Sequence, residues 1–365
     1  MQYRDFGKTG VKISALGFGA MRLPQSEEEA VRVIRRAFEL GVNYLDTARI
    51  YPDSEVKCGK ALKGWRDKIY LSTKNNLEDN TVEGWWSRLN TSLELLDTDY
   101  IDFYQIVHDM KFQHYDEFLC KGGMDAARKA REQGLIKYCC ISTHETPENM
   151  IKLLDTGEFD GMTVQYNLLD RVNTEVIAHA HELGLGIVVM GPVGGGRLGA
   201  PSDKIKELIS APVASSAEVA LRFVLANPGV TCAISGMSTI EMVEENCATA
   251  SREDPLSDEE RLAIEASLDE NKRLAELYCT GCEYCMPCPH EVNIAANFSI
   301  MNAHRIYGLT DHAQRRYNRL SDPEHPARGK KAQDCLECGQ CEPKCPQKIP
   351  IIAQLREVAE TFKKK

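Results

Sequence analysis

Short apolar runs alternate with amphipathic stretches through the first two thirds of the chain, and this alternation most constrains its fold. The strand candidates are residues 16–20, 43–46, 69–74, 101–108, 138–142, 161–166, 187–190 and 231–235. Helix candidates between them include residues 27–40, 82–95, 125–133, 147–154, 174–183 and 240–250. Such alternation predicts a parallel sheet. Eight units within roughly 250 residues favour a closed (β/α)8 barrel over an open sheet.

Two further segments frame this barrel. The turn Gly7-Lys8-Thr9-Gly10 predicts a small hairpin that closes the barrel floor. After the last strand, residues 256–277 predict one more helix, with Ser257 as a cap and Glu260 three residues later. We therefore expect a barrel domain, residues 1–272, and a second domain, residues 273–365.

The second domain holds eight of the 14 cysteines in two closely spaced runs. They are Cys279, Cys282, Cys285 and Cys288 in the first run, and Cys335, Cys338, Cys341 and Cys345 in the second. The second run has the spacing C-x2-C-x2-C-x3-C-P, typical of bacterial iron–sulfur proteins in which the fourth cysteine reaches a second cluster. The runs thus predict two [4Fe–4S] clusters in a mostly helical, ferredoxin-like domain. Residues 294–319, between the runs, have helical spacing.

Zinc and disulfides are the alternatives for so many cysteines. Structural zinc usually takes two well-separated ligand pairs, whereas these thiols recur at about every third residue. Disulfide frameworks belong to secreted chains. The opening residues Met-Gln-Tyr-Arg-Asp-Phe-Gly lack the apolar segment of a signal peptide. Both alternatives are disfavoured, and we expect a cytoplasmic protein.

The charge balance bears on partners. The formal net charge of −10 argues against binding to nucleic acid, and no apolar run is long enough to span a bilayer. Residues 271–365, however, contain 15 Lys and Arg against 11 Asp and Glu. These cations either offset the charge of thiolate-ligated clusters or offer a docking surface to an acidic electron carrier, such as a ferredoxin or a flavodoxin-like protein.

Four polar residues fall at or just after the ends of consecutive strand candidates: Asp46, Tyr51, Lys74 and His108. Reactive groups of such barrels lie at the C-terminal ends of strands. Each residue alone has an ordinary structural explanation, but together they fit carbonyl reduction. Tyr51 would donate a proton to the developing alkoxide, with its pKa lowered by Lys74. Asp46 would orient Lys74, and His108 would direct the substrate oxygen.

The segments around these four residues resemble the aldo/keto reductase family. They are Asn43-Tyr-Leu-Asp-Thr-Ala-Arg-Ile-Tyr51, Leu71-Ser-Thr-Lys74 and Leu96-Asp-Thr-Asp-Tyr-Ile-Asp-Phe-Tyr-Gln-Ile-Val-His108. The resemblance implies a (β/α)8 barrel with a catalytic tetrad at Asp46, Tyr51, Lys74 and His108. With the cysteine runs, the chain is similar to the bacterial subgroup that carries a C-terminal 4Fe–4S dicluster domain.

The same resemblance implies a nicotinamide nucleotide, NAD(P)H, as cofactor. Its implied contacts are Ser142, Thr143, Gln165 and Met190 for the nicotinamide, the loop Gly191-Pro-Val-Gly-Gly-Gly196-Arg-Leu for the pyrophosphate, and Gly236, Glu245 and Asn246 for the adenosine. Many members have Lys, Ser or Arg for the 2′-phosphate at positions that hold Gly236, Met237 and Met242 here. A preference for NADP(H) is therefore doubtful, and NAD(H), weak binding or no nucleotide stay open.

The crossed pattern of two-cluster ferredoxins predicts how the cysteines divide. One cluster would take Cys279, Cys282, Cys285 and Cys345, and the other Cys335, Cys338, Cys341 and Cys288. Cys285 and Cys288 are separated by two residues, one fewer than Cys341 and Cys345. An uncrossed arrangement for the first run therefore stays open.

Three functions are compatible with this sequence. The first is a nicotinamide-linked oxidoreductase for a small carbonyl or alcohol substrate, with clusters that exchange electrons with a partner. The second is a barrel reductase whose clusters are structural or serve docking. The third is an iron–sulfur carrier or regulatory subunit without dehydrogenase activity. Substrate selectivity is expected to depend on loops, above all residues 109–124.

Overall fold

The structure of the chain is a computed structural model. It describes residues 1–196, 198–199, 201–209, 212–279, 282–346 and 348–363, without the side chains of 272–278. The chain forms two compact units. The first comprises Met1–Gly195 and Ala220–Asp258, and the second comprises Gly196–Val219 and Glu259–Lys365.

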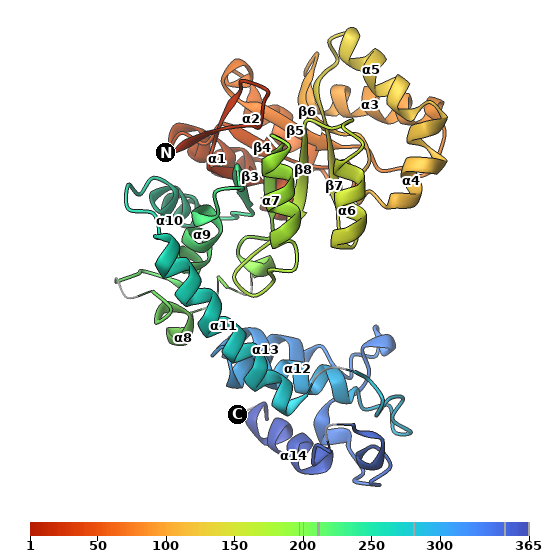
Figure 1. Cartoon of the computed structure of the whole chain (residues 1–365), viewed down its shortest axis with the longest axis vertical. Helices are drawn as coiled ribbons and strands as arrows, with labels where there is room; N and C mark the ends of the chain where they lie inside the picture. Colours follow the sequence, from red (N-terminus) through yellow and green to blue (C-terminus); the bar gives the residue numbers. More distant parts are fainter. Residues whose placement is uncertain (197, 200, 210–211, 280–281, 347, 364–365) are drawn as a thin grey trace. The chain divides into compact units, whose positions relative to one another are not determined.

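The first unit contains a closed barrel of parallel strands, as the sequence predicts (Figure 1). Around the barrel the strands follow the order β10-β3-β4-β5-β6-β7-β8-β9. Their bounds are β3 Leu16–Gly19, β4 Tyr44–Asp46, β5 Tyr70–Lys74, β6 Ile101–Gln105, β7 Ile136–Thr143, β8 Gly161–Gln165, β9 Gly186–Met190 and β10 Cys232–Ser235. Most residues of these strands are buried, because side chains fill the barrel on one face and helices cover the other.

Helices separate the strands and lie outside them (Figure 1). They are α1 Glu27–Glu39, α2 Ser54–Leu62, α3 Val82–Leu96, α4 Phe112–Glu117, α5 Gly123–Glu132, α6 Pro147–Leu154, α7 Thr174–Glu182, α9 Ser216–Ala226 and α10 Ile240–Ala250. Side-chain caps begin several of them: Ser26, Thr81, Thr146 and Thr239 each accept a bond from a backbone N–H in the first turn. The capping chemistry thus fixes where the helices start.

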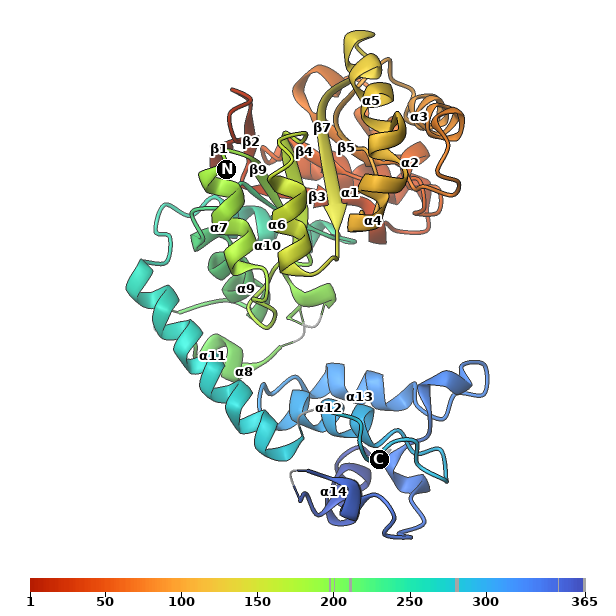
Figure 2. The same ribbon diagram turned by 45° about the vertical axis from the view of Figure 1, so that its right-hand side comes forward.

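The predicted hairpin consists of β1 (Tyr3–Asp5) and β2 (Lys12–Ser14), which pair antiparallel. It lies beside the start of β9 (Figure 2), where Lys8 N–H donates to the Gly184 carbonyl at 2.9 Å. Phe6 fills the space at this end, with its ring centroid 4.2 Å from that of Phe103. A Cβ on Gly186 would lie 2.3 Å from the Phe6 ring, so only glycine leaves room for this plug.

The second unit is mostly helical around the cysteine runs. Its helices are α8 Asp203–Lys206, α11 Asp258–Tyr278, α12 Ile294–Arg305, α13 Thr310–Asn318 and α14 Ile351–Thr361, with α11 assigned by its larger part. The helical stretch predicted at 294–319 is two helices, because the chain turns at Gly308 with φ +63°. A buried core that includes Phe298, Tyr317 and Phe362 packs against both cysteine runs.

The predicted domain boundary at residue 272 falls inside α11, and it stays a prediction. Short 3-10 helices complete the fold. They are η1 Ala20–Arg22, η2 Arg66–Lys68, η3 Leu119–Lys121, η4 Gly194–Gly196, η5 Pro326–Arg328, η6 Ala332–Asp334 and η7 Glu342–Lys344. Within the described parts of the chain, no helix combines the length and apolar composition needed to cross a membrane.

Candidate active site and cysteine pockets

A buried ion pair occupies the C-terminal ends of two neighbouring strands. Asp46 is the last residue of β4 and Lys74 the last of β5. Lys74 Nζ donates to Asp46 Oδ1 at 2.8 Å, to Asp46 Oδ2 at 2.6 Å and to the Thr47 carbonyl at 2.7 Å. Ser72 Oγ adds a bond of 3.0 Å to Asp46 Oδ1. Because Asp46 and Lys74 are each only 3% exposed, this geometry fixes the ammonium firmly.

Tyr51 lies beside this pair, in the loop between β4 and α2. Lys74 Nζ is 5.7 Å from the centroid of the Tyr51 ring. Burial raises the pKa of Tyr51, although the Lys74 ammonium lowers it; Asp46 raises it further. The expected net lowering of this pKa is therefore wrong for this structure. Burial, which a sequence does not display, outweighs the neighbouring cation, so the phenol is protonated at neutral pH.

His108 follows β6, which ends at Gln105 rather than at His108 as predicted. Beyond the strand, the His108 N–H donates to the Asn75 carbonyl at 2.7 Å, directly after the end of β5. Burial lowers the pKa of His108, and the Lys74 ammonium lowers it further, against the raising effect of Asp109 and Asp46. The imidazole is consequently neutral at pH 7 and offers one N–H donor.

These contacts bring Asp46, Tyr51 and Lys74 together, and the bond from the His108 N–H to the carbonyl of Asn75, the residue after Lys74, holds His108 near them. The group contains a protonated phenol, a fixed ammonium and a neutral imidazole. Such a group can donate a proton and a hydrogen bond to an oxygen atom that gains negative charge.

Replacing Lys74 with methionine is expected to lower the free energy of unfolding by about 3–5 kcal/mol, because it leaves the Asp46 carboxylate buried without its cation. Urea unfolding followed by circular dichroism measures this loss. Lys12→Met is the control, since the Lys12–Asp5 pair is exposed and should contribute far less. A loss for Lys74→Met no larger than for the control would contradict the importance of the buried pair.

The predicted nicotinamide contacts lie at the same ends of the next strands, but they differ in availability. Ser142 and Thr143 end β7, Gln165 ends β8 and Met190 ends β9. The Thr143 hydroxyl is buried and donates to the Met110 carbonyl at 2.6 Å, so it secures the loop after His108. Gln165 borders Gly191, where a Cβ would lie 2.7 Å from Gln165 Oε1. Of these residues Ser142 and Thr143 are buried, whereas Gln165 is half-buried.

The predicted phosphate loop begins at Gly191, directly after β9. Gly191, Gly194, Gly195 and Gly196 all have positive φ, from +59° to +86°. Asn167 Nδ2 fixes the loop by donating to the Gly191 carbonyl at 3.1 Å. Backbone without side chains can approach a phosphate closely. The donor chemistry of this loop thus fits a nucleotide pyrophosphate.

The predicted adenosine contacts follow β10. Gly236 lies directly after the strand, and Glu245 and Asn246 lie in α10. Asn246 is largely buried and donates from Nδ2 to Ser235 Oγ at 3.2 Å. Asn246 therefore ties α10 to the strand end, which leaves Glu245 and Gly236 as the more accessible members of this group.

The cysteines line two neighbouring pockets in the second unit. The first pocket is lined by Cys285, Cys288, Cys335, Cys338 and Cys341. The second is lined by Cys279, Cys282, Cys285 and Cys345. Each pocket thus includes the four thiols that the crossed pattern assigns to one cluster, and Cys285 lines both pockets. Four thiols around one pocket are the donor set of a [4Fe–4S] cluster.

The thiols differ in exposure. Cys282 and Cys338 are exposed, whereas Cys285 and Cys341 are half-buried. Burial raises the pKa of the Cys285 thiol to about 11, and the nearby Cys279, Cys341 and Cys345 add to this effect. Since iron binds thiolates, a cluster here would release protons as it binds.

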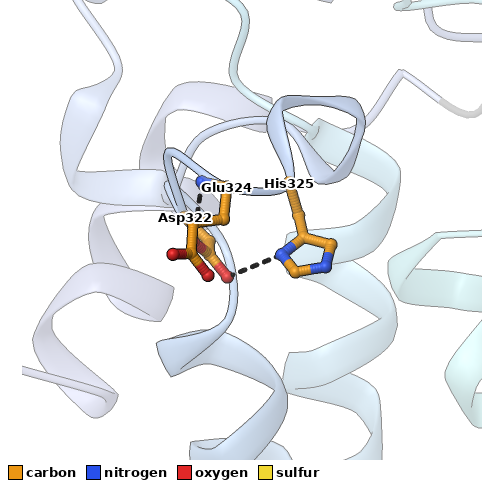
Figure 3. Close-up of side chains that lie close together, drawn as sticks. All are labelled: Asp322, Glu324 and His325. Atoms are coloured by element: carbon orange, nitrogen blue, oxygen red, sulfur yellow. Dashed lines mark hydrogen bonds and ion pairs between the residues drawn. The ribbon is translucent and has the colours of Figure 1, made fainter.

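One cluster of potential metal ligands was not anticipated from the sequence: Asp322, Glu324 and His325 (Figure 3). Asp322 Oδ2 is 3.1 Å from His325 Nδ1 and 3.2 Å from Arg328 Nη1. Asp322 Oδ1 accepts the Glu324 N–H at 3.0 Å. These internal bonds organise a surface turn, and Arg328 already balances the Asp322 charge.

Comparison with known proteins shows the family to which this barrel and the cysteine-rich domain belong. Residues 15–269 match the aldo/keto reductase family, and residues 278–349 match a 4Fe–4S dicluster domain. The chain belongs to the aldo/keto reductase family of oxidoreductases and carries a C-terminal 4Fe–4S dicluster domain.

Individual relatives agree with this family. An uncharacterized oxidoreductase of Bacillus subtilis, YqkF, is 30% identical over 301 residues, covering 73% of this chain and 96% of the relative. L-galactose dehydrogenase of Arabidopsis thaliana is 29% identical over 309 residues, covering 75% and 96%.

Solved structures show the same barrel. The holo form of aldo-keto reductase AKR11C1 from Bacillus halodurans is 32% identical, with a TM-score of 0.65, over 73% of this chain and 96% of that one. An aldo/keto reductase from Klebsiella pneumoniae, solved with NADP and acetate, is 23% identical, with a TM-score of 0.62, over 73% and 95%; it supports the fold alone.

Proposed function

We propose that this protein interconverts a small carbonyl compound and its alcohol with a nicotinamide nucleotide, using Asp46, Tyr51, Lys74 and His108. The observation that carries the proposal is the position of Lys74 Nζ, bonded to both oxygens of Asp46 and 5.7 Å from the Tyr51 ring. A cation beside a phenol stabilises the phenolate that forms when the phenol donates its proton, and the carboxylate holds that cation in place.

In the reductive direction, Tyr51 is the proton donor. Its burial keeps the phenol protonated in the resting site, because the pKa lies above the ordinary value. As the proton leaves, negative charge develops on the phenolic oxygen, and the Lys74 ammonium stabilises that charge. Asp46 and the Thr47 carbonyl prevent Lys74 from moving away. When bound, the nicotinamide would supply or accept the hydride.

His108 is the orienting group in this proposal. Its pKa is lowered, chiefly by burial, so the imidazole is neutral and can donate a hydrogen bond to the substrate oxygen. A neutral donor fixes the direction of the carbonyl without competing with Tyr51 as the acid. The substrate class follows from this chemistry: a small aldehyde or ketone, or the corresponding alcohol.

The choice between NADH and NADPH is left open by the adenosine segment. Gly236, Met237 and Met242 offer no cation to a 2′-phosphate, so the usual charge-assisted contacts at these positions are missing. We therefore expect at most a weak preference for NADPH.

We further propose two [4Fe–4S] clusters with crossed ligands. Cys279, Cys282, Cys285 and Cys345 would hold one, and Cys335, Cys338, Cys341 and Cys288 the other. The two thiol-lined pockets support this division. When bound, such clusters supply one-electron transfer or structural rigidity.

The exposure of this domain favours electron exchange with a partner. Cys282 and Cys338 are exposed, and so are the adjoining Tyr284 and Leu336, at 67% and 68%. A ferredoxin or flavodoxin-like carrier could approach the clusters at these positions. Structural or docking clusters are the second candidate, supported by the hydrophobic core that packs directly against the thiols. In that case the barrel would catalyse its reaction without exchanging electrons with the clusters.

Anaerobic titration of the iron-loaded protein with NADH or NADPH tests the proposal. If the nicotinamide and the clusters exchange electrons, we expect the visible absorbance of the clusters to fall in proportion to the nucleotide added, and a new EPR signal to appear. Unchanged absorbance with persisting aldehyde reduction would assign the clusters a structural role. Absence of nucleotide binding at millimolar concentration would contradict the enzymatic proposal and favour an electron carrier or regulatory subunit.

A further inference from the structure

Two polar side chains inside the barrel lie next to the buried Asp46–Lys74 pair and have no role in the proposed mechanism. Ser72 lies two residues before Lys74 on β5, and Gln105 lies two residues after Phe103 on β6, whose ring is part of the barrel core. Alternate residues of a strand share a face, so both side chains point to the barrel interior. They are 0% and 1% exposed. Because apolar side chains dominate the interior of such barrels, two polar ones require a reason.

Hydrogen bonds connect these two residues to the ion pair. Gln105 Nε2 donates to Thr163 Oγ1 at 3.0 Å and makes a longer bond of 3.4 Å to Ser72 Oγ. Ser72 Oγ donates to Asp46 Oδ1 at 3.0 Å, and the same oxygen accepts from Lys74 Nζ at 2.8 Å. A hydroxyl has a single proton. The bond from Gln105 therefore leaves the Ser72 proton directed at Asp46.

The amide of Gln105 is only partly satisfied. Its Oε1 atom is buried and has no hydrogen-bond partner within the described part of the chain. A buried acceptor without a partner costs stability, and a leucine of similar size would avoid that cost. Core packing alone thus gives no reason for an amide here, whereas the bond to Ser72 does.

The bond from Ser72 to Asp46 affects the electrostatics of Tyr51. Burial has the largest effect on the pKa of Tyr51 and raises it; of the two charged neighbours, Lys74 lowers this pKa and Asp46 raises it. A hydrogen bond to a carboxylate stabilises and disperses its negative charge. With Ser72 as a second donor to Asp46, the Lys74 ammonium is less fully neutralised and stabilises a Tyr51 phenolate more strongly.

Other titratable groups near the pair are His108, Tyr44, Cys58 and Cys232, whose pKa values respond to Asp46, and Glu55, whose pKa responds to Lys74. Burial has the largest effect on each of them: it lowers the pKa of His108 and raises the pKa of the other four. All five residues are the same in the wild type and in the variants described below. A difference between those proteins therefore reports the bond to Asp46.

We infer that Ser72 and Gln105 are positioning residues for proton transfer: Ser72 disperses the charge of Asp46, and Gln105 orients the Ser72 hydroxyl toward that carboxylate. Both act on Tyr51 through Asp46 and Lys74 rather than on the substrate. This inference rests on the proposed function, which assigns proton donation to Tyr51.

The ionisation of Tyr51 tests the inference without turnover. The ultraviolet absorbance of tyrosinate is titrated against pH for each protein with and without the additional change Tyr51→Phe, so that the difference reports Tyr51 alone. In Ser72→Ala the charge of Asp46 is dispersed less, so the pKa of Tyr51 should rise and the tyrosinate signal should appear at higher pH. Ser72→Thr keeps the hydroxyl and should restore the wild-type titration. Gln105→Leu should cause a smaller shift in the same direction as Ser72→Ala.

Carbonyl reduction should follow the same order. We expect kcat to fall by about 3- to 30-fold in Ser72→Ala and by less in Gln105→Leu, with KM for aldehyde and nucleotide within about twofold of the wild type. Reduction requires the protonated phenol, so its rate falls as the pH rises through the pKa of Tyr51. A higher pKa should therefore move the alkaline limb of the kcat profile to higher pH in both variants.

Ser14→Ala is the matched control. Ser14 is an equally buried serine on the hairpin strand β2, and its hydroxyl donates to the Leu16 carbonyl at 2.6 Å. This variant should leave the tyrosinate titration and the kcat profile unchanged.

An unchanged or lowered pKa of Tyr51 in Ser72→Ala would overturn the inference. A fall in kcat without movement of the alkaline limb would also overturn it, because a purely structural role lowers the rate without that shift. If the wild type reduces none of the aldehydes tested, the proposed function fails, and the tyrosinate titration still decides whether Ser72 acts on Tyr51.

Discussion

Replacing Tyr51 with phenylalanine is expected to lower the rate of carbonyl reduction by about 100- to 10,000-fold, the usual contribution of a positioned acid. The change removes one oxygen atom and keeps the ring that lies 5.7 Å from Lys74 Nζ. The buried Asp46–Lys74 pair should therefore persist, and with it the stability of the site. Steady-state kinetics with a panel of small aldehydes measures the loss, and calorimetry should give unchanged nucleotide affinity.

Tyr3→Phe is the matched control, because it deletes the same atom from an exposed tyrosine that bonds the Gly41 carbonyl at the barrel floor. It should leave carbonyl reduction unchanged. If Tyr51→Phe keeps activity within a few-fold of the wild type, another group donates the proton, and the role assigned to Tyr51 is wrong. Loss of nucleotide binding in Tyr51→Phe would instead point to a disrupted site.

The barrel could be predicted from the sequence because its strands and helices alternate with distinct periodicity. The capping residues Ser26, Thr81 and Thr146 mark helix starts by local chemistry alone. The ends of parallel strands converge in such a fold, so the positions of Asp46 and Lys74 indicated a meeting point that the structure bears out at 2.6 Å.

The sequence does not show how deeply a side chain is buried or which distant segments of the chain are in contact. The pKa of Tyr51 is raised because desolvation exceeds the effect of Lys74, and no motif reports that balance. The Thr143 hydroxyl turns to the Met110 carbonyl, which depends on how the loop after β6 folds back. The contact between Arg22 and Gly195 could not be predicted either, because it joins segments that are remote in the chain.

For the cysteine runs, the sequence predicts the kind of metal site better than it predicts which cysteines share a cluster. Their spacing alone predicts iron–sulfur chemistry, yet the division of the ligands between clusters depends on the fold. The decisive residues are Cys288 and Cys345, which end the two runs. Each lines the pocket formed mainly by the other run, Cys288 beside Cys335 and Cys345 beside Cys279.

Paired substitutions distinguish the crossed from the uncrossed arrangement. In the crossed arrangement, Cys282→Ser and Cys345→Ser damage the same cluster, so the double variant should keep about four of about eight irons per chain. The double variant Cys282→Ser with Cys288→Ser damages both clusters and should keep almost none. Iron analysis of anaerobically purified protein and EPR after reduction measure these outcomes.

The uncrossed arrangement predicts the reverse, because Cys282 and Cys288 would then share one cluster while Cys345 would belong to the other. Cys120→Ser is the control, since Cys120 is an exposed cysteine of the barrel unit outside both runs and should leave the iron content at its full value. Both double variants have the same number of serines, so a difference between them reports ligand grouping rather than the mere loss of thiols. A reversed pattern would refute the crossed assignment. Equal and complete iron loss in both would contradict the expected retention of four irons, because it would mean that one cluster does not survive loss of the other.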